Sequence, residues 1–247
     1  MLESASFQVD PGQIVGLLGA NGAGKSTLIA AVAGEIASSA GDVSFDGMPL
    51  GKMSVLQQAQ CRAVLPQSPG LSFDLSVDQV LQMGRYPFEG LVSADALDAS
   101  QTFVIQALSL DPIFHRSYLA LSGGEQQRVH LARVMVQVEA ALIVHDHAYL
   151  LLDEPLSSLD PAFQFEWMSF LSRYTRERKV GVLMALHDVN LAARWCDSIL
   201  LMSKRQLEIQ GSPKEVLTTE HLLATYGLNM QVMPHPLSPG RLLVLSP

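Results

Sequence analysis

The feature that most restricts how this chain can fold is a glycine-rich segment, Gly19-Ala20-Asn21-Gly22-Ala23-Gly24-Lys25-Ser26. It fits the pattern GxxxxGK[ST]. A short apolar run, Gln13 to Leu18, precedes it, and a segment with helical character, Lys25 to Val32, follows it. A buried strand that ends in such a loop and leads into a helix is typical of α/β proteins that bind nucleotide phosphates. The sequence therefore predicts a phosphate-binding loop between a strand and a helix.

The residue types in this loop suit phosphate chemistry. Glycines let the backbone curl so that several N–H groups point at phosphate oxygens, and the positive end of the following helix adds to the attraction. Lys25 can reach the β- and γ-phosphates, and the Ser26 hydroxyl can bind Mg²⁺. We expect residues 19–27, which end at Thr27, to contact the nucleotide. The alternative, a glycine-rich turn without a ligand, does not require the complete motif.

A second candidate site follows the apolar run Leu150-Leu151-Leu152, where two acids, Asp153 and Glu154, come together. Carboxylates at the carboxyl end of a parallel strand lie in the crevice where ligands bind. Asp153 would hold the hydration shell of Mg²⁺, and Glu154 could orient and deprotonate an attacking water. Many strands end in polar turns, so the acidic pair alone is weak evidence for a site; together with the phosphate loop it predicts a nucleotide-hydrolysing site.

The rest of the chain alternates strand and helix, which predicts an α/β protein with a parallel sheet. Further strands are expected at Tyr149 to Leu152, Val180 to Leu186 and Ser198 to Met202, the last leading into a hairpin that ends near Gln210; helices are expected at Pro161 to Arg178 and Asp188 to Trp195. Residues 71–137 differ, because they show helical pattern (Val77 to Met83, Ala94 to Ser109, Gly124 to Gln137) and no clear strand. We expect one domain, 1–247, with a helical subdomain at 71–137 inserted in it.

Residues 211–247 are expected to form a C-terminal appendage. Gly211-Ser212-Pro213 marks its start, a short helix is expected near Thr219 to Tyr226, and the apolar stretch Leu242 to Leu245 comes after three prolines.

Composition excludes several classes of protein. The chain has 16 Lys and Arg against 24 Asp and Glu, a net charge of −8, so we expect no nucleic-acid partner. The two cysteines, Cys61 and Cys196, lack metal-ligand spacing and fit a reducing cytosol. No apolar run approaches the length of a membrane span, and the first residues do not resemble a signal peptide.

One further segment, Leu121-Ser122-Gly123-Gly124-Glu125-Gln126-Gln127-Arg128, connects these observations. Ser122 and Glu125 form a capping box at a helix start, but a capping box needs neither two glycines nor Gln-Gln-Arg. The segment resembles the signature motif of ATP-binding-cassette (ABC) ATPases. The chain also resembles the family at Leu65-Pro66-Gln67, at Ser157-Ser158-Leu159-Asp160 and at Leu186-His187-Asp188. These segments occur in the order in which the family has them, and the resemblance covers almost the whole chain.

The resemblance implies a P-loop NTPase (RecA-like) core and hydrolysis of ATP with Mg²⁺. It implies a homodimer in which two copies pair head to tail, with each ATP between the phosphate loop of one copy and Ser122, Gly123, Gly124 and Glu125 of the other. Gln67 would complete the shell of Mg²⁺ and water, together with Ser26 and Asp153. Asp160 would bridge the dimer. Lys25, Glu154 and His187 would be the catalytic residues, with His187 contacting the γ-phosphate and helping to position the water.

Two segments, Met83 to Pro87 and His187 to Arg194, are similar to the ATPases of metal-chelate importers. That group handles ferric siderophores, cobalamin and haem. The haem branch fits first, because it tends to have a longer link between the signature helix and the acidic strand, as Val138 to Ala148 suggests, and to favour Ser-Ser-Leu-Asp. The resemblance thus implies an ATPase peripheral to the cytoplasmic face of the inner membrane, working with transmembrane permease subunits and indirectly with a substrate-binding protein. His145 and His147 are interpreted as a solvated loop rather than as ligands of a metal or haem.

The chain departs from the family ahead of the phosphate loop. The family usually begins with another strand, a turn and an aromatic residue that stacks on adenine, whereas here the loop starts at Gly19 and Phe7 is too close to serve. We expect weaker nucleotide affinity, lower stability and no first edge strand. Two alternatives of other classes remain: a soluble ABC ATPase acting on nucleic acid or the ribosome, which the acidic charge disfavours, and an inactive cassette, which the intact Lys25, Asp153, Glu154 and His187 disfavour.

Overall fold

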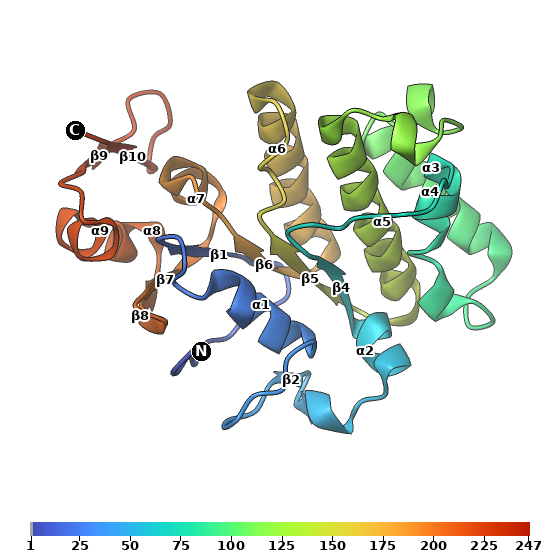
Figure 1. Cartoon of the computed structure of the whole chain (residues 1–247), viewed down its shortest axis with the longest axis horizontal. Helices are drawn as coiled ribbons and strands as arrows, with labels where there is room; N and C mark the ends of the chain where they lie inside the picture. The colour runs from blue at the N-terminus through green and yellow to red at the C-terminus, as the bar shows by residue number, and fades with distance from the viewer. Residues whose placement is uncertain (1) are drawn as a thin grey trace.

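A computed structural model describes residues 2–247, and a six-stranded sheet lies at its centre (Figure 1). The strand order is β4-β5-β6-β1-β7-β8, with all neighbours parallel except β7 and β8. The strands are β1 (Ile14–Gly19), β4 (Arg62–Leu65), β5 (Ala148–Asp153), β6 (Val180–Ala185), β7 (Ser198–Ser203) and β8 (Gln206–Gly211). The α/β prediction and the expected hairpin are confirmed.

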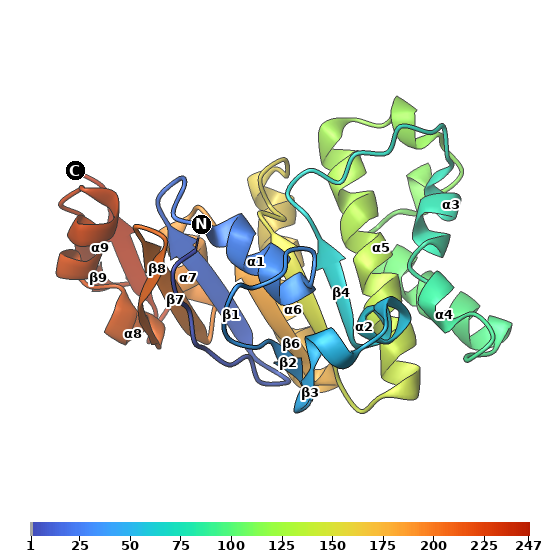
Figure 2. The ribbon, with the colours of Figure 1, turned by 60° about the horizontal axis from the view of Figure 1, so that its bottom comes forward.

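Helices cover both faces of this sheet. Figure 2 shows α1 (Lys25–Ala33) in front of the sheet, with α6 (Pro161–Arg178) and α7 (Val189–Trp195) behind it. Because β1 and β6 are buried along their whole length, their sequences are continuous apolar runs; the edge strand β8 alternates between half-buried and exposed residues. Burial on two faces therefore explains why the central strands were readable as short apolar runs.

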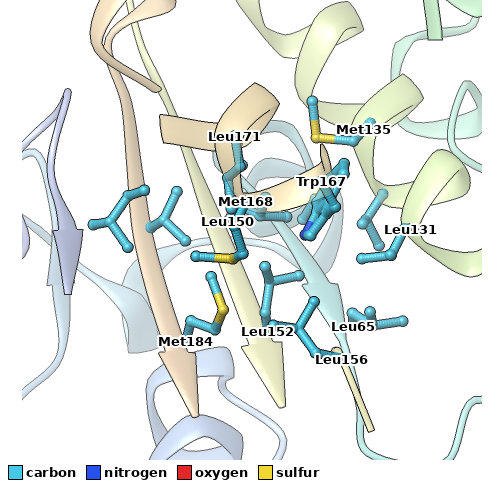
Figure 3. Packing of buried hydrophobic residues seen from close by; sticks show 14 of the residues in the cluster. Leu65, Leu131, Met135, Leu150, Leu152, Leu156, Trp167, Met168, Leu171 and Met184 are labelled. Carbon is cyan, nitrogen blue, oxygen red and sulfur yellow. The ribbon is translucent and has the colours of Figure 1, made fainter. Parts of the chain in front are cut away.

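The larger core lies between the sheet and the helices behind it. Figure 3 shows Leu150, Leu152 and Met184 of the sheet against Trp167, Met168 and Leu171 of α6, with Leu131 and Met135 of α5 (Gly123–Val144) beside them. Alternate residues of β1 divide between two cores. Ile14 and Leu18 belong to this larger cluster, whereas Val15 and Leu17 pack with Leu28 of α1 on the other face.

The helices α3 (Val77–Gln82), α4 (Ala94–Ala107) and the first part of α5 lie together at the β4 end of the sheet (Figure 1), within the residues predicted to form a helical subdomain. The predicted end of the last helix, at Gln137, is wrong. Residues 138–144 continue α5, because they include good helix formers and the segment from Val138 to Ala141 is buried. The segment interpreted as an inserted link is therefore mostly helix. Gln137 Nε2 donates to the carbonyl oxygens of Ala59 and Arg62 at 2.7 and 3.1 Å, which attaches α5 to the first residue of β4 and to the helical turn before it.

Several elements were not predicted. Before the last segment of the chain they include β4 itself, the small hairpin β2 (Ser44–Phe45) and β3 (Met48–Pro49), and α2 (Val55–Cys61); beyond Gly211, a helix at 213–216 and two strands at 231–234 and 242–245 were not predicted either. A four-residue strand such as β4 is too short to show a period. Ahead of β1, no named strand occurs among the described residues; Ser4 makes an isolated bridge to Gln206 of β8.

Residues 211–247, predicted as a C-terminal appendage, contain α8 (Pro213–Val216), α9 (Thr219–Tyr226) and a hairpin of β9 (Gln231–Pro234) and β10 (Leu242–Leu245). The predicted helix at Thr219–Tyr226 is confirmed. The hairpin packs against α7, and α8 packs against β7 and β8. Within residues 2–247, none of the helices combines the length and apolar character that spanning a membrane requires.

Candidate active site

The phosphate loop joins the end of β1 to the start of α1. Gly24 is the residue before the first helical turn and has a φ of 100°, a left-handed conformation that favours glycine. No side chain caps the helix there, so N–H groups of its first turn stay available to an anion. The loop geometry is therefore that of a phosphate cradle.

Lys25 lies buried beneath this loop. Its Nζ donates to the carbonyl oxygens of Gly19 and Ala20 at 2.8 and 3.4 Å. Burial lowers the pKa of the Lys25 ammonium group, while the nearby carboxylates of Glu154 and Asp153 act in the opposite direction. The Lys25 ammonium group is therefore held by two carbonyl groups of the loop, beside the cavity described below.

Asp153 ends β5 and lies near Ser26 and Lys25 of the phosphate loop. The residue is 5% exposed, and its Oδ1 has no hydrogen-bond partner. Burial raises the pKa of this carboxyl, and the Ser26 hydroxyl acts in the opposite direction. An orphaned carboxylate oxygen beside a hydroxyl fits hydrated Mg²⁺, which binds through one or two protein oxygens and keeps several waters. Ser26 and Asp153 could therefore hold that ion.

Glu154 stands between two other side chains that the sequence singled out. Its Oε2 accepts a hydrogen bond from Gln67 Nε2 at 2.9 Å, and its Oε1 lies 2.6 Å from His187 Nε2. Gln67 follows β4, Glu154 follows β5 and His187 follows β6, and these three strands are neighbours in the sheet. The Glu154 side chain is 10% exposed and that of His187 48% exposed. A carboxylate is thus held at the sheet edge, next to the phosphate loop.

Most of the predicted nucleotide-site residues line one cavity of about 490 Å³, but Asp153 and the loop residues Gly19, Ala20 and Ala23 are not in its lining. Its predicted members are Asn21, Gly22, Gly24, Lys25, Ser26, Thr27, Gln67, Glu154 and His187. Leu2 and Arg205 line it as well and were not predicted; Arg205 sits in the two-residue turn between β7 and β8, and nothing in the local sequence marks it. No aromatic residue lines the cavity within the described part of the chain. Phe7 packs against the core cluster on the α1 face of the sheet.

The signature segment lies outside this cavity. Ser122 caps α5 by accepting from the Glu125 N–H at 3.4 Å, while the Ser122 N–H and hydroxyl donate to Glu125 Oε2 at 2.8 and 2.7 Å. These hydrogen bonds from Ser122 hold the pKa of Glu125 below its usual value. The capping box is confirmed. Gly124 lies close to the Ser158 carbonyl oxygen, so the start of α5 touches the loop after the acidic pair.

Asp160 is also outside the cavity, where its side chain caps α6 by accepting from the Phe163 N–H at 3.0 Å. Of the predicted site, one chain therefore brings together the phosphate loop, the acidic pair, Gln67 and His187. It does not bring Asp160 or the residues Ser122, Gly123, Gly124 and Glu125 to them. His147, at the other end of β5, lies 2.7 Å from Asp46 Oδ1, and His145 is exposed.

Comparisons with known proteins find relatives of this chain along nearly its whole length. The family model described as "ABC transporter" matches residues 2–157. Hemin import ATP-binding protein HmuV of Bordetella avium is 46% identical over 245 residues, which cover 99% of this chain and 93% of the relative. HmuV of Pseudomonas fluorescens is 44% identical, over 96% of this chain and 90% of the relative.

Solved structures show the same fold. An inward-facing structure assigned to the metal-chelate type of ABC transporter matches with a TM-score of 0.76 and 25% identity, over 98% of this chain and 88% of that one. A bacterial ABC transporter cassette solved as a dimer matches with a TM-score of 0.74 and 21% identity, over 86% and 90%. The predicted P-loop NTPase fold is confirmed.

Proposed function

Because the chain belongs to the ABC transporter family of ATP-binding proteins, we propose that it hydrolyses ATP to drive the import of haem through a separate membrane permease. The proposal of haem rests on relatives named for hemin import, to which the chain is 46% identical over nearly its whole length. The likeness to a transporter of the metal-chelate type supports the same class of cargo. Siderophore and cobalamin import are the nearest alternatives.

The geometry suggests how the residues divide the work. The loop N–H groups and Lys25 bind the phosphates of ATP, and Gly19 to Thr27 surround them. Ser26, Asp153 and Gln67 would hold Mg²⁺, which neutralises phosphate charge when bound. Glu154 orients and deprotonates the attacking water, while His187 contacts the γ-phosphate from the neighbouring strand end. The pairing of Glu154 with Gln67 and His187 is the observation that supports this mechanism best.

We propose that the site is completed by a second copy of the chain. In one copy, Ser122 and Asp160 lie outside the cavity that contains the phosphate loop. A head-to-tail homodimer would bring the partner's signature helix, with its positive N-terminal end, to the γ-phosphate. The protein would then work on the cytoplasmic face of the inner membrane with permease subunits, supplied indirectly by a substrate-binding protein. A net charge of −8 supports the absence of a nucleic-acid partner.

Glu154→Gln tests this function. Glutamine keeps the size of the side chain but cannot take a proton, so hydrolysis should fall by roughly 10²- to 10⁴-fold, the range of general base catalysis. Phosphate release is measured in the complex with its permease, with and without haem-loaded binding protein. The matched control is Glu166→Gln, on the exposed face of α6, which should hydrolyse ATP like wild type.

The outcomes separate the alternatives. If haem stimulates hydrolysis by wild type and Glu154→Gln shows no hydrolysis, both the ATPase activity and haem as the cargo are supported. If wild type hydrolyses ATP equally with and without haem, the transport ATPase is still supported, but siderophores or cobalamin become the proposed cargo. Equal phosphate release by wild type and Glu154→Gln would refute the assignment of the catalytic site. Glu154→Gln should also dimerise with ATP, because the nucleotide between two copies is not hydrolysed.

A further inference from the structure

The side chain of Asn190, in α7, makes two hydrogen bonds to the C-terminal hairpin. Asn190 Nδ2 donates to the Val244 carbonyl oxygen at 2.9 Å, and Asn190 Oδ1 accepts from the Val244 N–H at 2.7 Å. The side-chain amide thus satisfies both backbone groups of one residue of β10, as a neighbouring strand would. This pairing fixes the orientation of the amide, because its nitrogen must face the carbonyl and its oxygen the N–H.

The hairpin is fixed to the protein at this point and not loosely attached. Val244 is 6% exposed and belongs to the larger core, and Val232 and Leu242 pack against that core. The appendage before the hairpin is also anchored, since Val216 of α8 and Leu222 of α9 are fully buried. Asn190 therefore connects α7 to a part of the chain that is itself held on the sheet.

Asn190 is three residues after the candidate catalytic histidine, His187. The residues directly before and after His187 are both held by hydrogen bonds. Before it, the Leu186 N–H donates to the Leu17 carbonyl oxygen at 3.0 Å. After it, Asp188 Oδ1 accepts from the N–H groups of Asn190 and Leu191 at 2.7 and 3.2 Å and so caps α7. The backbone of Asn190 holds the cap that follows His187, and its side chain holds β10.

The position of His187 depends on this backbone. Its side chain is half exposed and is 2.6 Å from Glu154 Oε1, so few packing contacts orient the ring. The helix α7 has seven residues, too few for a helix to be stable without tertiary support. The hairpin supplies such support beside the first turn of α7, where Asn190 lies.

We propose that Asn190 is a positioning residue for ATP hydrolysis: by binding β10 it fixes the start of α7, and with it His187 against Glu154. The C-terminal hairpin is then a brace for the catalytic histidine. This inference rests on the proposed ATPase function and gives the appendage a role in it.

Two variants remove the contact from opposite sides. Asn190→Ala deletes the amide. Val244→Pro removes the N–H that donates to Asn190 Oδ1 and leaves the Asn190 side chain in place; because Val244 is also buried in the core, its effect on kcat is compared only if its melt shows that the variant is folded. Each should lower kcat by about 3- to 10-fold, the effect of one or two ordinary hydrogen bonds. The KM for ATP should stay within about twofold, because the phosphate loop is untouched. Leu245→Ala, at an exposed residue of β10, is the matched control and should behave like wild type.

The decisive measurement is the kcat of Asn190→Ala made in a protein that also carries His187→Ala, compared with the kcat of His187→Ala alone. If Asn190 acts through His187, Asn190→Ala should cause no further loss of kcat there, since residues that act as a unit are non-additive. Circular dichroism melts check that each variant is folded, and Val244→Pro serves as the test variant if Asn190→Ala is not.

Three results would overturn the inference: an unchanged kcat in both folded variants, an equal fold-loss with and without His187, or a raised KM at constant kcat. Wild type and Glu154→Gln are assayed in parallel. If wild type shows no hydrolysis above Glu154→Gln, the proposed function itself has failed; if it does and Asn190→Ala equals wild type, only the positioning role has failed.

Discussion

Gly84→Ala should destabilise the helical subdomain although glycine-to-alanine changes often stabilise proteins. Gly84 follows α3 and is buried against α5, with an ordinary backbone φ. A Cβ added there would lie 2.4 Å from the Arg133 carbonyl oxygen and 3.1 Å from the Gln137 N of α5. Ordinary contact begins at 3.4 Å, so the first distance is about 1 Å too short. The obstructing atoms are backbone, and no rotamer change can remove the clash.

The expected loss follows from this displacement. Either α3 moves away from α5 by about 1 Å, which loosens their packing, or the backbone of α5 distorts locally. Overpacking of a well-packed site typically costs about 1–3 kcal/mol. For a domain of this size, about 1 kcal/mol lowers Tm by roughly 2–4 °C. Gly84→Ala should therefore melt a few degrees to about ten degrees below wild type.

Urea titrations and thermal melts measure the loss of stability in Gly84→Ala, with Gly51→Ala as the matched control. Gly51 lies in a short 3-10 turn with an ordinary φ, and a Cβ there would meet no atom within 4 Å. The control should stay within about 0.5 kcal/mol of wild type, as surface changes usually do. If Gly84→Ala loses no more stability than Gly51→Ala, the close approach of α3 and α5 does not have the energetic weight assigned to it.

Two further predictions concern buried titratable groups. Burial lowers the pKa of His130 to about 4, with Arg133 adding to the effect, whereas the unfolded chain takes up this proton near pH 6.5. The free energy of unfolding should therefore fall by roughly 2 kcal/mol between pH 7 and pH 5 on account of this group, and urea titrations of His130→Gln should lack that share. Burial also lowers the pKa of Lys25, so its charge disfavours the folded state below the unfolded pKa of 10.5. Without nucleotide, Lys25→Met should be more stable than wild type at pH 7, with the difference shrinking as the pH rises toward 10.5; with ATP the order should reverse, since only wild type binds it. A Lys25→Met protein less stable than wild type without ATP would contradict this.

Elements whose signal is local were predictable from the sequence. The phosphate loop has a fixed order of residue types between an apolar run and a helix, and it folds as that order requires. The Ser122–Glu125 cap needs only residues three apart, and α6 begins and ends where its pattern does, at Pro161 and Arg178. The end of α5 was missed, because an apolar stretch after a helix is consistent with more helix or with a connection to the next strand.

What the sequence determined by itself was the set of chemical groups and the strand-and-helix order in which they occur. Which groups meet was decided by the tertiary structure. Gln67, Glu154 and His187 converge because β4, β5 and β6 are neighbours in the sheet, and strand order is not written in any one segment. Arg205 reaches the cavity through a hairpin turn, and Asn190 binds Val244 across 54 positions of the chain. A local pattern specifies backbone conformation over a few residues, whereas contacts between distant segments depend on how all the apolar faces are buried together.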